Sequence, residues 1–396
     1  MNLLDLLQDG ILGLSGWGKV LVTFAMLQVS MMATTLYLHR DQAHRALDLH
    51  PALRHFFRLW MWLTSGMVTR QWVAVHRKHH ALCEKPGDPH SPVVFGLKKV
   101  LLEGAELYRV AARDPEVVAK YGRGTPDDWL ERNVYTRGTW FGIYSMLTID
   151  ILLFGVIGIT IFAIQMASMP IFSAGVINGL GHARGYRNFE SDDAATNLYP
   201  FAVLIGGEEL HNNHHAFPSS AKFSMRPWEF DIGWLYITIF KALGLAKVRR
   251  VAPEPQFAPA PRPVDIETLK AVLVNRMHVL REYSSKVTLP VFRREAAVDE
   301  TARSVSPRLL VRRPQLLDDN ARARLASLLE RNQSLRTVHE YRQRLMAVWE
   351  EAHVSNETLV RRLREWCAEA EASGIEALQE FSARLRGYLP QPGYAA

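Results

Sequence analysis

A run of 39 residues, Thr139 to Ile177, contains a single charged side chain, Asp150. At 1.5 Å rise per residue, about 20 apolar residues span the ~30 Å hydrocarbon core of a bilayer, so one straight helix of this length would overshoot it. We therefore expect two helices that are separated near Gly155 or Gly158. Burial in the core of a soluble protein is the alternative.

A second apolar stretch, Val20 to Leu38, follows Lys19 and contains no charged side chain. It differs from a cleaved signal sequence, because no basic segment precedes it and no small-residue cleavage site follows it. Two runs of spanning length favour insertion into a membrane over burial in a soluble core. The shorter apolar stretch Leu3–Leu14 is expected to lie along the membrane surface. The expected spans are residues 18–38, 139–156 and 158–177.

The second part of the chain has a different composition. Residues 1–250 carry 25 basic and 21 acidic side chains, whereas residues 251–396 carry 22 basic and 19 acidic side chains in a much shorter length. Five prolines predict an extended linker over residues 251–264. Beyond it, apolar residues recur at helical spacing, so residues 265–396 are expected to form a small soluble α-helical domain.

Charge and cysteine content argue against several classes of function. The net charge of +7 is spread over both parts, so neither is basic enough to indicate a nucleic-acid partner, and none is expected. Cys83 and Cys367 have no CxxC or CxxH spacing, which argues against a disulfide scaffold, a zinc finger and an iron–sulfur cluster. Basic residues are frequent between positions 40 and 99, and by the positive-inside rule this face is cytoplasmic.

Nine of the 15 histidines fall into groups at the expected cytoplasmic ends of the membrane segments. Two groups share the spacing HxxHH, which places three imidazoles on one face of a helix. His39 and His44 are five residues apart, about 140° around an ideal helix, so this pair is expected to hold a metal at a frayed helix end. Asn178 and His182 are four residues apart and can share a face. The grouped histidines are His39, His44, His76, His79, His80, His182, His211, His214 and His215.

Nine imidazoles exceed the coordination positions of one metal ion, so two bound metal ions are expected. Neutral imidazole suits iron, zinc, copper and nickel, and the histidines alone leave the metal open. Surface histidines beside membrane helices are the alternative. The role of His90, which follows Asp88 and Pro89, is left open between a lone histidine and a member of the site. Lone surface or core positions are the preferred interpretation of His50, His55, His278, His339 and His353.

The order of these groups around an apolar hairpin resembles the integral-membrane acyl desaturases, especially the Δ9 stearoyl-type enzymes. The flanking residues are also similar, above all the run Gly207–Pro218, GEELHNNHHAFP, and further Asp88–His90 and Gly185–Arg187. The resemblance covers about residues 17–250 and implies a membrane desaturase domain over residues 1–250. The implied fold is all-α, an integral-membrane helical bundle with a cytoplasmic di-iron cap, followed by the small soluble α-helical C-terminal domain.

The resemblance also assigns roles to residues. It implies that the nine grouped histidines bind two iron ions, that Asn178 reaches one iron through water, and that Glu208 orients a ligand imidazole. Trp72 resembles a tryptophan that lines the acyl tunnel of the family, with an interface anchor as the alternative. No catalytic residue separate from the metal ligands is implied.

The implied reaction is the O2-dependent insertion of a cis double bond, at Δ9 by similarity, into a saturated acyl chain carried on CoA or on a lipid. Methylene C–H bonds are too strong for side-chain acid–base chemistry, so a metal cofactor must carry the reaction. The sequence contains no haem-binding HPGG-type motif, so an external, ferredoxin-like electron donor with its reductase is expected. Ala74 and Val75 replace an Arg-Asp pair of the family, and Gly66 and Ala174 replace polar tunnel residues.

Two other functions stay open. A di-iron membrane hydroxylase of alkyl or lipid substrates belongs to the same metal superfamily, although the run His214–Pro218 favours a desaturase. A membrane metal-binding or transport protein is the third possibility, but transporters place ligands at the bilayer midplane, whereas these histidines lie outside the apolar runs. The expected location is a bacterial inner membrane, with the histidines and the C-terminal domain facing the cytoplasm, and with membrane lipid and O2 as partners.

Overall fold

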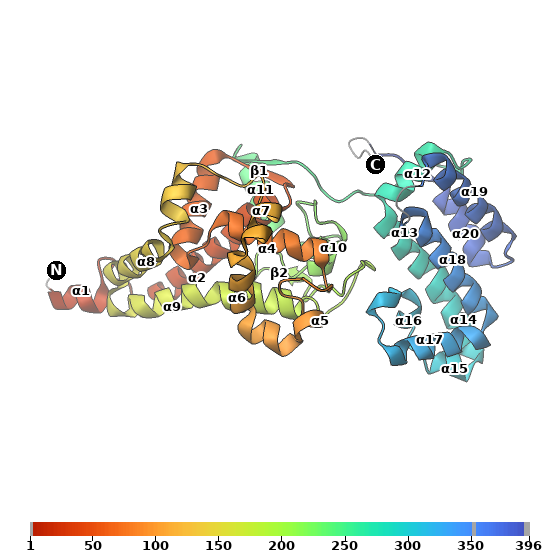
Figure 1. Ribbon diagram of the computed structural model, residues 1–396, viewed down its shortest axis with the longest axis horizontal. Coiled ribbons are helices and arrows are strands. Elements are labelled where there is room, and N and C mark those ends of the chain that lie inside the picture. Colours follow the sequence, from red (N-terminus) through yellow and green to blue (C-terminus); the bar gives the residue numbers. More distant parts are fainter. Residues whose placement is uncertain (1–2, 351–353, 392–396) are drawn as a thin grey trace. The chain divides into compact units, whose positions relative to one another are not determined.

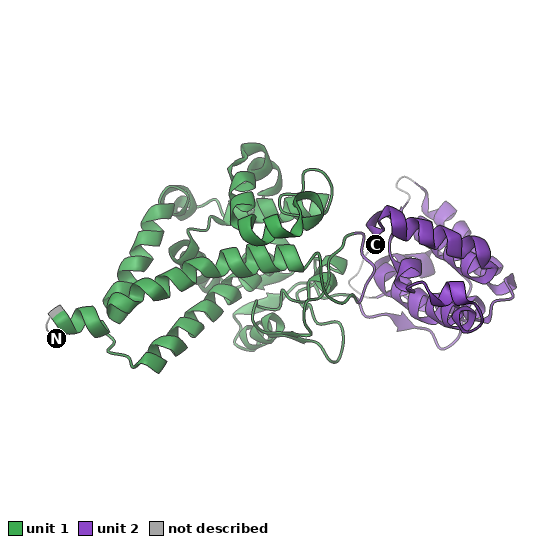
Figure 2. Ribbon diagram, turned by 90° about the horizontal axis from the view of Figure 1, so that it is seen from below, with its two compact units in different colours: residues 1–187, 193–252 green, residues 188–192, 253–396 purple. Residues whose placement is uncertain are grey.

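The computed structural model describes residues 3–350 and 354–391, so His353 lies outside the described residues. Most of the described residues lie in helices, and the strands form three short two-stranded pairs. The expectation of a mainly helical fold is therefore confirmed. The chain divides into two compact units (Figure 2), which consist of residues 1–187 with 193–252 and of residues 188–192 with 253–396.

The first long helix of unit 1 changes its winding near the site. It begins as α2 (Gly16–Met32), with Ser15 as its N-cap, and continues without a break into a π-helical segment, Ala33–Ala43. The whole helix, Gly16–Ala43, is long and apolar enough to cross a membrane. Most residues of α2 are exposed or half-buried, whereas every residue of the π-helical segment is buried.

The long apolar run forms a hairpin. α8 (Thr139–Phe154) and α9 (Gly158–Ser168) are joined by one 3-10 turn, and α9 continues as a second π-helical segment, Met169–Leu180. The chain turns at Gly155, whose φ of 71° and ψ of −154° suit essentially glycine alone. The run Thr139–Leu180 is also long and apolar enough to cross a membrane. α2, α8 and α9 extend together, away from α10 (Figure 1).

The N-terminal apolar stretch packs on the tip of this hairpin. α1 (Leu3–Asp9) lies against the turn, and after it the backbone N–H of Ile11 donates to the carbonyl of Leu152 at 2.8 Å. A Cβ on Gly155 would lie 2.5 Å from the carbonyl oxygen of Leu7, so the two backbones meet closely. The stretch is therefore fixed to the hairpin.

Shorter helices of unit 1 surround the inner ends of the long ones. Buried side chains such as Leu36, Tyr37, Phe57 and Ile237 join them in one hydrophobic core. β1 (Leu47–Leu49) pairs antiparallel with β4 (Ala246–Val248), and β2 (Phe201–Ala202) pairs parallel with β3 (Phe230–Asp231). The helices are α3 (Pro51–Ser65), α4 (Thr69–Leu82), α5 (Pro92–Phe95), α6 (Leu97–Arg113), α7 (Pro115–Tyr121), α10 (His211–Ala216) and α11 (Ile232–Ala242).

Unit 2 is a helical unit with its own core. The rings of Tyr283, Trp366 and Phe381 lie at its centre, and those of Tyr283 and Phe381 are 5.0 Å apart. Its helices are α12 (Ile266–Val274), α13 (Arg276–Tyr283), α14 (Leu289–Val298), α15 (Glu300–Arg303), α16 (Arg308–Val311), α17 (Asp319–Arg331), α18 (Gln333–Glu350), α19 (Asn356–Ala372) and α20 (Glu376–Leu385).

Two features of unit 2 differ from the sequence-based expectation. Part of the expected linker, residues 251–264, is structured, because β5 (Gln256–Phe257) pairs antiparallel with β6 (Tyr388–Leu389). The unit also contains the loop 188–192, in which Asp192 forms an ion pair of 2.9 Å with Arg313. Neither contact is local in sequence, so composition and periodicity could not predict them.

Candidate metal centre

The nine grouped histidines meet in unit 1 although they are far apart in the sequence. His39 lies in the π-helical segment after α2, and His44 follows that segment directly. α4 and α10 carry three histidines each, and the turn after Leu180 carries His182. Residues as distant as His39 and His214, 175 positions apart, come into direct contact. The histidines divide into two clusters.

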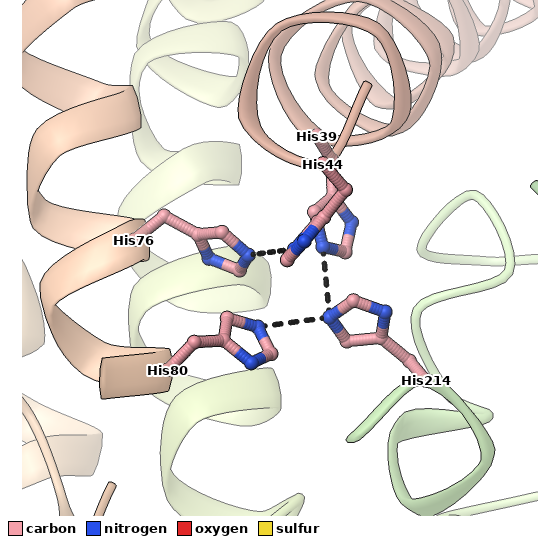
Figure 3. Close-up of side chains that lie close together, drawn as sticks. All are labelled: His39, His44, His76, His80 and His214. Atoms are coloured by element: carbon pink, nitrogen blue, oxygen red, sulfur yellow. Dashed lines mark hydrogen bonds between the residues drawn. The ribbon is translucent and has the colours of Figure 1, made fainter. Parts of the chain in front are cut away.

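The first cluster contains five imidazoles (Figure 3). Nε2 of His214 lies 3.1 Å from Nε2 of His39 and 3.0 Å from Nε2 of His80, and the Nε2 atoms of His44 and His76 are 2.8 Å apart. Lone pairs at such distances repel one another unless a proton or a cation lies between them. The members, whose ligand atoms all lie within 4.8 Å of one another, are His39, His44, His76, His80 and His214.

The second cluster contains the other four imidazoles and a thiol. The ligand atoms of His79, Cys83, His182 and His215 all lie within 4.8 Å of one another. Nε2 of His211 is 3.0 Å from Nε2 of His182, which adds a fourth imidazole. Sequence reasoning missed Cys83, because it considered cysteine only in pairs.

The π-helical winding explains how His39 and His44 share a cluster. The expectation that they lie on different faces of a fraying α-helix is wrong, because the backbone N–H of His44 donates to the carbonyl of His39 at 3.0 Å. This i to i+5 bond is the π-helical pattern. It brings the two ring centroids to 4.9 Å.

A buried ion pair supports the same segment. Arg40, next to His39, is fully buried and donates to Asp231 at 3.0 Å, and its guanidinium lies 3.8 Å from the ring centroid of Phe223. Asp231 also caps α11 by accepting from the N–H of Trp234. A buried arginine paired in this way holds the backbone beside His39 in place.

Four carboxylates bind the outer nitrogens of four histidines. Each accepts from Nδ1 of one ring, so that Nε2 of that ring is left for the cluster. Glu208, which sequence reasoning placed in this role, also accepts from the hydroxyl of Thr35 at 2.7 Å. The pairs are Glu208 with His39 at 2.7 Å, Asp88 with His79 at 3.0 Å, Glu84 with His182 at 3.1 Å and Asp193 with His215 at 2.9 Å.

Burial keeps six of the nine imidazoles uncharged. It lowers the pKa of His215 to about 4, although the carboxylate of Asp193 acts in the opposite direction. At neutral pH these rings are therefore in the form that binds metal ions. Burial, with neighbouring imidazoles as a second cause, also lowers the pKa well below its usual value for His44, His76, His80, His211 and His214.

The donor set fits two bound metal ions. Nε2 of His215 is buried, and it neither donates nor accepts a hydrogen bond among the described residues. An unpaired buried nitrogen is costly, and a metal ion would satisfy it. Imidazole donors suit iron among other first-row metals.

A family model described as fatty acid desaturase matches residues 15–231, more than half of the chain. The chain belongs to this family. Members of the family are oxidoreductases associated with membranes, and they generally use iron. Both apolar helices and both histidine clusters lie in the part of the chain that the match covers or directly adjoins.

Individual relatives give the same assignment for unit 1. The Delta-9 acyl-lipid desaturases 1 and 2 of Arabidopsis thaliana are 30% and 29% identical to this chain, each over 61% of it and over 78% and 77% of their own length. The sn-1 stearoyl-lipid 9-desaturase of a Synechocystis strain is 28% identical over 61% of this chain and 75% of its own length.

Unit 2 gives a different match. A family model described as transposase matches residues 270–391, less than a third of the chain. The matched residues form helices α12 to α20 and strand β6. The match is too short to assign the whole chain to that family.

A cavity of about 700 Å³ adjoins the histidines of this desaturase-family domain. His39, His76 and His211 line it, together with Asn178. Trp72 also lines it, and its ring stacks on that of His76 with centroids 4.9 Å apart. The volume lies within the range of pockets that enclose small molecules. Gly66 and Ala174, the positions that the resemblance matched to polar tunnel residues, line the same cavity.

Most of the other histidines lie apart from the clusters. His50 caps α3 by accepting from the N–H of Ala52, and His55 is exposed. His278 and His339 lie in unit 2. His90 differs, because it is buried, its ring centroid is 4.5 Å from that of His79, and it groups with Asp88.

The residues that sequence reasoning missed carried at most partial signals. Asp88 stood in a family-like motif, yet nothing in its spacing showed that it would accept from His79 nine positions earlier. Glu84 lies at a φ of 63°, a conformation that sequence does not reveal, and Asp193 follows a loop that belongs to unit 2. Only the three-dimensional fold brings these carboxylates to the imidazoles.

Proposed function

We propose that the chain is an O2-dependent acyl desaturase that inserts a cis double bond, at Δ9, into a saturated acyl chain. The observation that carries the proposal is the convergence of nine imidazoles in two clusters beside one cavity. Membership of the desaturase family supports the reaction class. The names of the Arabidopsis and Synechocystis relatives support the Δ9 position and a lipid-bound acyl chain.

Two iron ions would occupy the clusters. The first would be held by the five imidazoles of the first cluster, and the second by His79, His182, His211 and His215, with Asn178 acting through water. When bound, the irons supply the redox chemistry with O2 that unactivated methylene groups require. The four outer carboxylates keep the tautomer of their rings, so that Nε2 faces the metal.

The cavity would hold the acyl chain. Trp72, fixed by stacking on His76, would form part of the wall that sets which carbons face the histidines. Burial of the clusters excludes water from the reacting carbons. Ala74 and Val75 stand where acyl-CoA enzymes have a charged pair, which favours a lipid carrier over CoA.

The remaining partners follow from the balance of the reaction. Formation of one double bond removes two hydrogens from the chain and reduces O2 to two water molecules, so two electrons and two protons must be supplied. We propose a ferredoxin-like donor with its reductase as the source of the two electrons, and water as the source of the two protons. Three membrane spans, with the histidines and unit 2 on the cytoplasmic side of an inner membrane, agree with the distribution of basic residues.

Lipid analysis tests the function directly. The full chain is expressed in a host that lacks endogenous desaturation, and its fatty acids are identified by gas chromatography with mass spectrometry. We expect a new cis-Δ9 alkene. Loss of the alkene in His214→Ala, with no loss in His55→Ala, would tie the reaction to the first cluster, because His55 is an exposed imidazole elsewhere.

The same experiment distinguishes the other two functions. A new hydroxyl group in place of the alkene would show a hydroxylase. Unchanged lipids, with both variants and the wild-type chain present in the membrane together with the electron donor, would contradict an acyl-modifying enzyme and favour a metal-binding protein.

A further inference from the structure

We propose that Cys83 is a fifth protein ligand of the second metal ion and binds it through a thiolate. The proposal rests on the metal centre proposed above and adds a sulfur donor to it. It follows from the position of one side chain at the end of α4.

Helical spacing brings Cys83 to the second cluster. The residue follows α4 directly and stands four positions after His79, so the two side chains share a face. Its Sγ lies 3.8 Å from Nε2 of His79. Nitrogen and sulfur donors at about 2.1 and 2.3 Å from one metal ion would be about 3.1–3.8 Å apart for angles of about 90–120° at the metal, so the observed separation suits two ligands of the same ion.

The surrounding nitrogens are directed to the same place. Asp88, Glu84 and Asp193 bind Nδ1 of His79, His182 and His215, respectively, which leaves Nε2 of each ring on the side of the thiol. Nε2 of His215 is buried and has no hydrogen-bond partner within the described part of the chain. This nitrogen and the sulfur therefore face a shared position that a metal ion would fill.

A first-row metal ion takes about four to six ligands, so the second ion has room for a fifth protein donor. The second cluster offers it four imidazoles. A thiolate would add the fifth, beside the water proposed to be held by Asn178. When the S–metal bond forms, the S–H bond breaks, the proton passes to solvent, and no electron is transferred, because a bound divalent cation deprotonates a coordinating thiol.

Cobalt(II) provides a test with an optical signal. The purified full chain is depleted of metal and reloaded with cobalt(II) alone. We expect an intense near-ultraviolet charge-transfer band, which requires a cobalt–thiolate bond and does not arise from imidazole ligands. The band should be lost in Cys83→Ser and in Cys83→Ala. It should persist in Cys367→Ser, because Cys367, the other cysteine, is buried in unit 2.

The outcomes separate this proposal from the one on which it rests. Two bound cobalt ions without the band would overturn the thiolate ligand and leave the metal centre in place. A chain that binds no cobalt would overturn both. X-ray absorption of the wild-type iron form gives a second measurement that needs no variant: sulfur scattering at about 2.3 Å from iron supports the proposal, and nitrogen or oxygen scattering alone contradicts it.

Discussion

At the scale of single residues, four carboxylates define which nitrogen of each of four imidazoles faces its cluster. Glu208 is the clearest example, because one of its oxygens accepts both from His39 and from Thr35 at 2.7 Å. Its side chain is almost fully enclosed. Loss of such a partner frees the imidazole to rotate or to change its tautomer, which typically costs about 10–100-fold in metal affinity.

Glu208→Ala is therefore expected to weaken metal binding at the first cluster by about 10–100-fold and to reduce desaturation in proportion. Glu208→Gln should restore part of the affinity, because an amide oxygen still accepts from Nδ1. Metal retained against a graded series of chelator concentrations measures the effect. Glu106→Gln, at an exposed position of α6, serves as the control, and equal retention in all four proteins would contradict the role of Glu208.

His339 in unit 2 provides a pH-dependent prediction. Burial lowers its pKa to about 4, with the positive charge of Arg342 as a second cause, whereas the unfolded chain has the usual value of about 6.5. Above pH 6.5 the neutral ring makes its full contribution to stability. As the pH falls from 6.5 to 4, the unfolded state takes up the proton and the folded state is destabilised.

Amide hydrogen exchange of α18 in the full chain measures this effect, after correction for the intrinsic pH dependence of exchange. Protection should be constant above pH 6.5 and should fall toward pH 4. In His339→Gln the loss of protection toward pH 4 should be smaller. The remaining loss should come from His278, because burial lowers the pKa of that residue too. A slope that is identical in the variant and the wild-type chain would show that His339 does not carry the effect.

The histidine groups could be recognised from the sequence because HxxHH places ligands on one helix face, which is a local property. Apart from Glu208, which the family resemblance pointed out, the carboxylates could not, because Asp193, for example, reaches His215 across 22 positions and a loop. Cys83 is an intermediate case. Its position four residues after His79 is visible in the sequence, but its role depends on imidazoles that come from other elements.

At the scale of elements, two departures from the α-helix build the site. The π-helical segment Ala33–Ala43 turns His39 and His44 to the same side, which an α-helix would not do. The second, Met169–Leu180, ends directly before the turn that carries His182. Hydrophobic periodicity predicted helices in both regions but cannot distinguish π-helical from α-helical winding. The break of the long run, in contrast, was visible in its glycines.

The hairpin turn gives a prediction for stability. Gly155→Ala places a Cβ 2.5 Å from the carbonyl oxygen of Leu7 and forces a backbone conformation that suits glycine, so a cost of about 1–3 kcal/mol is expected. Gly16→Ala adds the same methyl group where nothing lies within 4 Å and should have little effect. Thermal unfolding in detergent compares the two variants. Equal midpoints would show that the turn tolerates a side chain.

At the scale of the whole molecule, a desaturase-family unit is joined to a second, helical unit. Their boundary was visible in the change of charge density and in the prolines. The assignment of loop 188–192 to unit 2 was not, because it depends on contacts such as that between Asp192 and Arg313. The apolar helices of unit 1 and the basic residues between them support the orientation proposed above.

The orientation can be checked with reporters fused after unit 2. With three spans and the basic loops inside, the fused C-terminus is cytoplasmic, so a fluorescent protein should be active and alkaline phosphatase inactive. The opposite pair of results would reverse the orientation. A fusion truncated after Phe154, in the turn of the hairpin, should give the inverse pattern and serves as the internal control.

The central claim is that nine imidazoles hold two iron ions. The most direct test is the iron content of the purified full chain, determined by mass spectrometry of the metal and quantitative amino-acid analysis of the same sample. We predict two iron atoms per chain, with loss in His214→Ala and His215→Ala and no loss in His55→Ala. A folded, catalytically active chain with less than one iron atom, or iron that is unaffected by both cluster variants, would contradict the claim.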